Sequence, residues 1–163
     1  MELVAGTPRD VEALLAALDG VATDHGVVAQ AFDARYVAGR DHLRRAVEIA
    51  DRERARGEGI ADDPAMEVLL YAAGRRQIDR ALAMGARGGE PAVVVLAGDE
   101  EGDETAAADT VRAHEAFDAH EVDLGDPTTL REFFEVSDAE LAAADGDLAG
   151  IVRERVALLV VER

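Results

Sequence analysis

The chain has 163 residues, enough for a continuous hydrophobic core that needs no disulfide or metal to stabilise it. It contains no cysteine, which excludes disulfides, zinc–thiolate sites and cysteine nucleophiles. Its 35 acidic and 17 basic residues give a formal net charge of −18, and every basic residue is arginine.

This acidic composition without lysine resembles that of proteins from salt-loving archaea, whose acidic surfaces stay hydrated in concentrated salt. The acidity therefore says more about the solvent than about a binding partner. The first residues do not form a basic region followed by a long apolar run, and no stretch of about 18 apolar residues occurs in the sequence. We expect a soluble, cytoplasmic protein without membrane contact.

The first part of the chain alternates predicted strands and helices. Thr7 and Pro8 predict a helix start, with Thr7 as the cap, and Asp19-Gly20 predicts its end. The elements expected before residue 60 are a strand over 2–5, a helix with Val11, Leu14, Leu15 and Leu18 buried, a strand over 27–32, and, after Gly39, a helix to about Arg56 with Leu43, Ala46, Val47 and Ala50 inward.

Residues 64–85 predict a hairpin of two short helices. Asp62 or Asp63 can cap the first helix, Pro64 suits its first turn, and Gly74 suits a left-handed end. The expected buried residues of the first helix are Met66, Leu69, Leu70 and Ala73, and Ile78, Ala81 and Leu82 start a second apolar stripe. A cluster of arginines therefore lies at the elbow of the hairpin.

The rest of the chain begins with a strand and then becomes helical. The β-branched run Val93–Val95 predicts a strand over 91–97 that is buried on both faces. The later elements expected are helices over 105–113, from Asp126 through Phe134, after the Ser137 capping box and from Asp147, with a weak strand over 119–122. The order predicts one domain over 1–163 of mixed α/β (α+β) class, with a central sheet of about 3–4 strands flanked by helices and a helical C-terminus.

The sequence lacks the motifs of most catalytic and metal-binding sites. His114-Glu115 and His120 do not have the spacing of a zinc-protease motif, and all four histidines are expected to be solvated. Ser137 is the only serine and suits a helix cap better than a nucleophile. The acidic run 99–104 lacks calcium-loop spacing. We therefore expect no enzyme activity, cofactor, metal or small-molecule substrate.

The arginines are unevenly distributed. Residues 35–87 contain eleven arginines and nine acids, whereas residues 88–150 contain two arginines and eighteen acids. Single-stranded RNA is held by stacking on planar groups and by hydrogen bonds to phosphates. Arg75, Arg76 and Arg80 could supply both, with Gln77 reading a base edge and Ile78 as an apolar platform. The alternative is that the arginines form ordinary ion pairs on helix surfaces.

The run Glu67–Tyr71, followed by Gly74, Arg76-Gln77-Ile78, Ala81 and Gly85, resembles the central motif of the kinase-binding subunit of the KEOPS complex, the PRPK-binding protein (TPRKB) family. The resemblance implies a non-catalytic subunit that binds and regulates the protein kinase of the complex. It also implies recruitment of tRNA by its 3′ CCA end for N6-threonylcarbamoyladenosine modification. The matched motif positions are Arg76, Gln77 and Ile78, and Arg75 departs from the family pattern.

The last helix is the second predicted surface. Its apolar residues are more numerous than one core-facing stripe needs, which is consistent either with complete burial or with a face for a protein partner. By position, the resemblance implies kinase docking through Ile151, Val152, Arg155 and Leu159. Two other hypotheses stay open: a small-molecule-binding or enzymatic domain with its site at the strand ends, and a spacer that contacts the kinase but no RNA.

Overall fold

The protein structure is a computed structural model that describes residues 1–161, except for the side chains of residues 101 and 102. Its internal contacts define two compact units. The sheet unit comprises Met1–Ala34 and Gly85–Asp123, and the helical unit comprises Arg35–Met84 and the chain from Leu124 onward. The single domain expected over 1–163 stays a prediction.

The sheet unit contains an antiparallel four-stranded sheet in the order β2-β3-β1-β4, which confirms the expected mixed α+β class. Its strands are β1 (Glu2–Pro8), β2 (Val28–Asp33), β3 (Ala92–Ala97) and β4 (Phe117–Ala119). Every residue of β3 is buried, as the β-branched run predicted.

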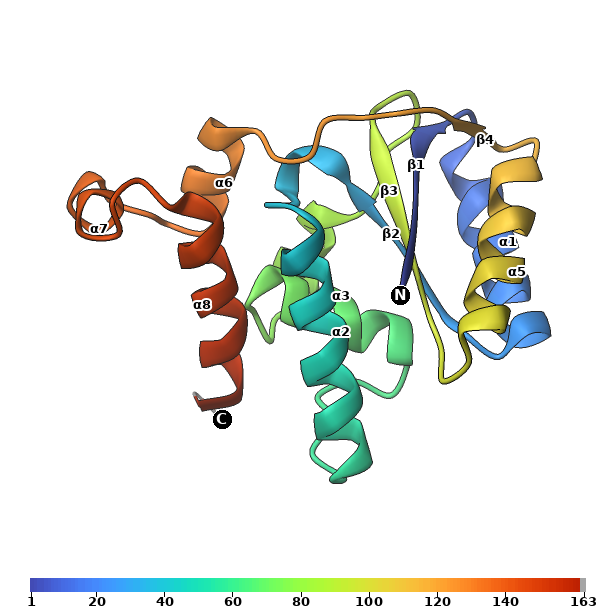
Figure 1. The fold of residues 1–163 in the computed structure, drawn as a ribbon, viewed down its shortest axis with the longest axis horizontal. Helices are drawn as coiled ribbons and strands as arrows, with labels where there is room; N and C mark the ends of the chain where they lie inside the picture. The colour runs from blue at the N-terminus through green and yellow to red at the C-terminus, as the bar shows by residue number, and fades with distance from the viewer. Residues whose placement is uncertain (162–163) are drawn as a thin grey trace. The chain divides into compact units, whose positions relative to one another are not determined.

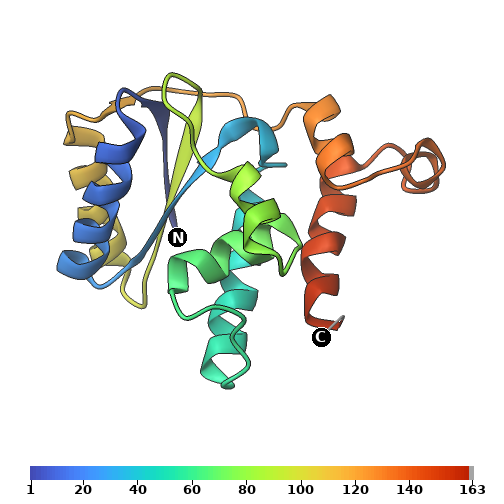
Figure 2. The same ribbon diagram turned by 180° about the vertical axis from the view of Figure 1, so that it is seen from behind.

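Two helices, α1 (Val11–His25) and α5 (Glu101–Ala113), lie side by side against one face of this sheet (Figures 1 and 2). Alternate residues of the strands point to that face, because side chains alternate along a strand. Together they form one hydrophobic cluster, whose members include Val4, Leu14, Leu18, Val94, Leu96, Ala107, Val111 and Phe117.

The predicted boundaries of the first helix were wrong at both ends. Thr7 and Pro8 remain in β1, where they pair with β4, and Asp10 caps α1 by accepting from the Ala13 N–H at 3.1 Å. The helix continues through Gly20 because Val21 still packs into the core. It ends at Gly26, whose φ of 64° provides the left-handed C-cap. The last strand was also misplaced, since β4 ends where the predicted strand begins.

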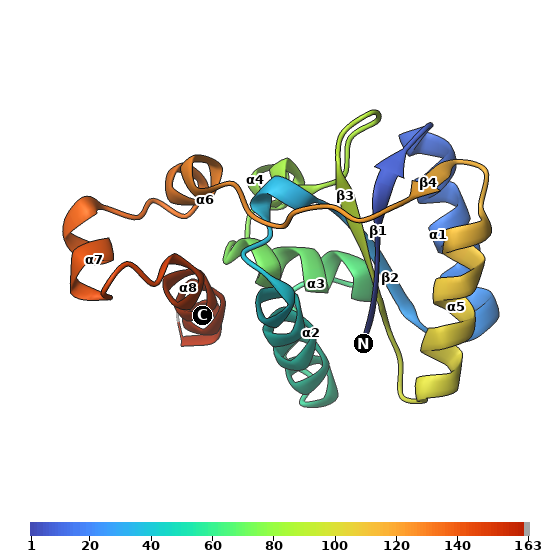
Figure 3. The same cartoon turned by 45° about the horizontal axis from the view of Figure 1, so that its top comes forward.

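The helical unit is built from α2 (Arg40–Ala55), α3 (Pro64–Ala73) and α8 (Leu148–Val161), which pack against one another. Figure 3 shows how the chain runs from α6 (Pro127–Phe133) through α7 (Asp138–Ala143) into α8. The inward stripe predicted on α2 is confirmed, since Leu43, Ala46, Val47 and Ala50 are all buried. The helical C-terminus is confirmed as well. In the described chain, no helix has the length and apolar character to span a membrane.

One prediction about a polar side chain in this unit was wrong. His42 was expected in solvent, but it is buried between α2 and the end of α3. The second apolar stripe is divided: Ala81 of the short helix α4 (Ile78–Ala81) is buried, whereas Ile78 and Leu82 are 50% and 53% exposed. The helix lasts only one turn before a 3₁₀ turn over Leu82–Met84, and Met84 enters the core in their place.

Candidate functional site

The hairpin elbow is created by the tight end of α3. Asp63 caps the start of this helix, Pro64 occupies its first turn, and Gly74 ends it with a φ of 63°. The N–H of Arg75 then bonds to the Leu70 carbonyl at 3.1 Å, which closes the turn. The chain therefore changes direction just before the predicted binding residues, Arg75 to Arg80.

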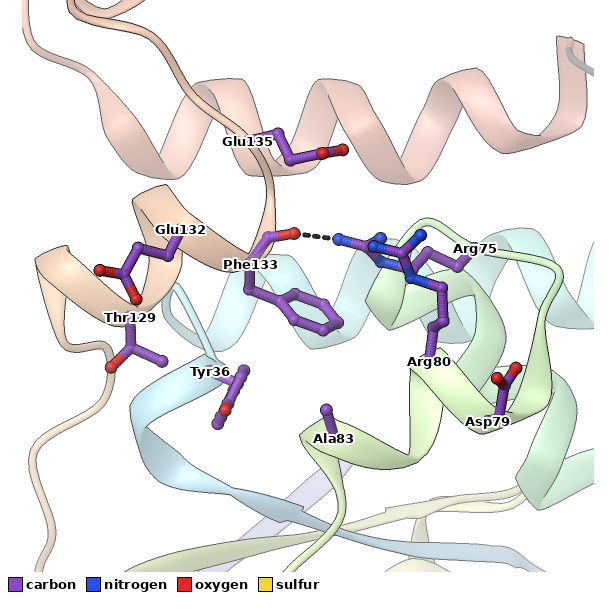
Figure 4. Close-up of a pocket in the computed structure, with 9 residues that line it drawn as sticks. All are labelled: Tyr36, Arg75, Asp79, Arg80, Ala83, Thr129, Glu132, Phe133 and Glu135. Atoms are coloured by element: carbon purple, nitrogen blue, oxygen red, sulfur yellow. Dashed lines mark hydrogen bonds between the residues drawn. The ribbon is translucent and has the colours of Figure 1, made fainter.

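Arg75 lies partly buried against α6 (Figure 4). Its guanidinium donates to the Phe133 carbonyl and stacks over the Phe133 ring, with Cζ 4.3 Å from the ring centroid. Burial lowers the pKa of Arg75, and the nearby positive charge of Arg80 lowers it further, while Glu135 acts in the opposite direction. The Arg75 guanidinium therefore holds its own unit together and also faces a second cation.

Arg76 points to a different part of the same unit. Its Nη2 donates to the Leu159 carbonyl of α8 at 3.2 Å. Its buried Nε–H has no hydrogen-bond partner within residues 1–161. Arg76 therefore ties the elbow to α8, and only part of its guanidinium is open to solvent.

The remaining predicted residues of the elbow are exposed. Gln77, Ile78 and Arg80 all face solvent, and the Arg80 side chain forms no hydrogen bond or ion pair with the described residues. Ile78 and Leu82 are four residues apart, so they form one small apolar surface, while Arg80, two residues from each, points to another side of the turn. The elbow thus presents an exposed apolar platform and an exposed cation.

A pocket of about 440 Å³ opens beside the elbow arginines Arg75 and Arg80 and extends to α6 (Figure 4). Tyr36 and Phe133 contribute its aromatic surface, with ring centroids 5.2 Å apart in an edge-to-face arrangement. The other lining residues are Arg75, Asp79, Arg80, Ala83, Thr129, Glu132 and Glu135. This mixture suits a planar polar group: the rings can stack on it, the arginines can bind an anion, and the carboxylates can accept from an amine.

Sequence reasoning missed Tyr36 and Phe133. Both lie more than 35 residues from the elbow along the chain, and neither belongs to a local motif that indicates a site. The packing of α6 brings the Phe133 ring to Arg75, and Tyr36 reaches the same pocket from the 3₁₀ turn over Ala34–Tyr36. The sequence signal that could have found them is weak. It is the scarcity of these aromatic residues, since the chain has only two tyrosines and four phenylalanines.

The structure separates the predicted kinase-docking residues of α8 into two groups. Ile151, Val152 and Leu159 are core residues with at most 3% exposure. Arg155 forms a two-pronged ion pair with Glu140, with distances of 2.6 and 2.7 Å. This hydrogen bonding raises the pKa of Arg155 and lowers that of Glu140. The exposed apolar residues of α8 are instead Leu158 and Val161.

The described residues do not gather the groups of a metal site: no cluster of three or more His, Asp or Glu side chains is placed to hold an ion. In the sheet unit, a pocket of about 470 Å³ beside β1 and just after the end of β4 is lined by Ala5, Glu121, Val122 and Asp123. Two carboxylates beside apolar groups lack a partner base or nucleophile in that lining. The elbow is thus the better candidate site.

The fold and the elbow define a class of protein: a small mixed α+β protein with an exposed surface of arginine and apolar residues. The family described as "Kinase binding protein CGI-121" matches residues 10–159. The chain therefore belongs to the CGI-121 family of kinase-binding proteins. No individual curated protein gives a match to the chain.

Proposed function

We propose that this protein is a non-catalytic subunit of a KEOPS-type assembly that binds its protein kinase and recruits tRNA through the 3′ CCA end. The recruited tRNA would then receive the threonylcarbamoyl group from other subunits. Membership of the CGI-121 family supports the kinase-binding part. The exposed elbow, where Gln77, Ile78 and Arg80 all face solvent, is the observation that carries the tRNA part.

In this proposal the five elbow residues have different roles. Ile78 stacks on a base, Gln77 reads a base edge, and Arg80 contacts a phosphate, because all three face solvent. Arg75 contributes its open N–H groups at the pocket, while one N–H stays on the Phe133 carbonyl. Arg76 acts mainly by holding the elbow on α8. Arginine suits these roles because it both stacks and makes fork-like hydrogen bonds.

Kinase docking on α8 is proposed to use the exposed side of the helix. Leu158 is 38% exposed and Val161 is 77% exposed, and their spacing of three residues places them on one side. Ile151, Val152 and Leu159 would support this surface from the core, and Arg155 would fix the helix to Glu140. A kinase would therefore touch the neighbours of the residues predicted from position alone.

The test compares tRNA binding by the wild type, Ile78→Glu and Arg80→Glu. Both variants should bind intact tRNA at least about tenfold more weakly, because stacking and phosphate contact are lost. Wild-type binding should also fall when the CCA end is removed. Leu15→Glu and Arg112→Glu are matched controls, since both side chains are exposed and lie in the sheet unit.

The kinase part is measured with the same proteins, by capture of the partner kinase. Leu158→Glu should weaken capture and leave tRNA affinity unchanged, whereas Ile78→Glu should do the reverse. Unchanged affinity of Ile78→Glu and Arg80→Glu for intact tRNA would show that the elbow is not the RNA site. Equal binding of trimmed and intact tRNA would contradict recognition of the CCA end.

A further inference from the structure

The helix α2 concentrates positive charge in an acidic chain. Residues 40–56 contain six arginines and four acids, whereas the whole chain has a formal net charge of −18. One of these arginines stabilises its own unit, since Arg54 donates to the carbonyls of Ala61 and Asp62 at 2.8 and 3.2 Å. The remaining arginines must therefore be judged by their position and their partners.

Three of them share one side of the helix. Arg45, Arg52 and Arg56 are spaced by seven and four residues, so they align along the axis over about 16 Å at about 1.5 Å per residue. Their side chains are 42%, 49% and 63% exposed. We name Arg45, Arg52 and Arg56 the α2 stripe. The buried stripe of α2, which includes Leu43 and Ala50, holds the helix in its unit and fixes the orientation of these arginines.

The ion pairs of the α2 stripe are long. Arg45 lies 3.9 Å from Glu48, while Arg52 and Arg56 lie 3.7 and 4.0 Å from the same carboxylate, Glu53. The Arg45–Glu48 pair is exposed on both sides and contributes little. Glu53 is fully buried and its charge is compensated by Arg52 and Arg56, but at these distances each guanidinium keeps N–H donors that can bind another anion.

We propose that the α2 stripe binds the phosphate backbone of paired RNA, as a contact separate from the elbow that holds the single-stranded end. Charge complementarity supports this partner, because a row of exposed guanidinium groups matches a row of phosphates. A duplex carries on the order of one phosphate charge per 1.7 Å of axis, so the length of the stripe covers several phosphates. The contact is independent of base sequence, since it involves no base edge. The proposal rests on the proposed function for the identity of the RNA.

The test uses the double variant Arg45→Gln with Arg56→Gln, which leaves Arg52 beside the buried Glu53. Affinity for intact tRNA is measured over a series of salt concentrations. Each lost phosphate contact should reduce the slope of log affinity against log salt by about 0.9, so the double variant should lose about 1.8. Its affinity for a short single-stranded RNA that ends in CCA should equal that of the wild type.

The matched control is Arg9→Gln with Arg112→Gln, which removes the same charge from exposed arginines of the sheet unit. The control should keep the wild-type slope. A wild-type slope in the α2 double variant would overturn the proposal, and loss of kinase capture in its place would identify the stripe as a protein-docking surface. If the wild type binds trimmed and intact tRNA equally, the proposed function fails, and a blunt RNA duplex then tests the α2 stripe alone. Weaker binding of this duplex by the double variant would uphold the stripe as a duplex-binding surface. Equal binding by the wild type and the double variant would overturn it.

Discussion

His42 shows how one buried polar side chain is kept neutral. Its Nδ1 accepts from the Ala38 N–H at 3.0 Å, and its Nε2 donates to the Ala72 carbonyl at 2.8 Å. Burial lowers the pKa of His42 to about 4, although the bond to Ala72 opposes this shift, and the charge of Arg153 adds to it. Both ring nitrogens are satisfied only in the neutral form, so protonation would break the bond to the Ala38 N–H.

The stability of the protein should therefore fall as the pH decreases from about 6.5 to about 4. In this range the unfolded state binds a proton at His42 that the native state does not bind, and the full effect is on the order of 3 kcal/mol. His42→Gln should lose about 1–3 kcal/mol at pH 7 but lack this contribution to the pH dependence. Urea unfolding of both proteins at several pH values measures the difference. Parallel pH profiles of the two proteins would contradict the assignment.

At the level of elements, the sequence predicted correctly those helix ends and buried faces that depend on neighbouring residues. The start of α3 at Pro64, its end at Gly74 and the inward stripe of α2 all follow from the cap, the turn or the periodicity of a few neighbours. The predictions failed where a distant segment decides. Thr7 stays in a strand because β4 pairs with it, and His42 is buried because it packs against the end of α3.

The candidate site divides in the same way. Its arginines were visible as a cluster in the sequence, but the aromatic surface of Tyr36 and Phe133 depends on tertiary packing. Periodicity identified Ile151 and Leu159 as apolar positions of a helix. It did not reveal that they face the core, because a helix that is apolar on several sides gives no preferred face.

Gly74→Ala tests how tightly the elbow is seated on α8. A Cβ at Gly74 would lie 3.3 Å from the Arg155 carbonyl oxygen, at a φ of 63°. The variant should lose about 1–2 kcal/mol from the left-handed conformation alone, and more from crowding against α8. Gly26→Ala is the matched control, since Gly26 has a φ of 64° and no atom within 4 Å of the added Cβ. Thermal unfolding should show a larger loss of stability for Gly74→Ala. Equal losses of stability in the two variants would indicate that α8 shifts to accommodate the added methyl group without losing stability.

At the scale of the whole molecule, charge is the dominant property. The 35 acids outnumber the 17 arginines, and many of the ion pairs are loose contacts within a helix, such as Arg44–Asp41 at 3.3 Å and Arg45–Glu48 at 3.9 Å. Such pairs contribute about 0–1 kcal/mol each and do not remove the repulsion among the excess carboxylates. A compact state with this net charge is destabilised by self-repulsion, and salt reduces that repulsion.

The melting temperature should therefore rise when KCl is increased from about 0.1 M to about 1 M, because the Debye length falls from about 10 Å to about 3 Å. A triple variant with Asp19→Asn, Glu115→Gln and Glu121→Gln separates this screening from general salt effects. These exposed carboxylates form no ion pair with the described residues, so their removal costs no contact. The variant should melt higher than the wild type in low salt and gain less from added KCl. An equal rise in melting temperature in both proteins would show that KCl stabilises the fold by exclusion from its surface. Repulsion among the carboxylates would then contribute little.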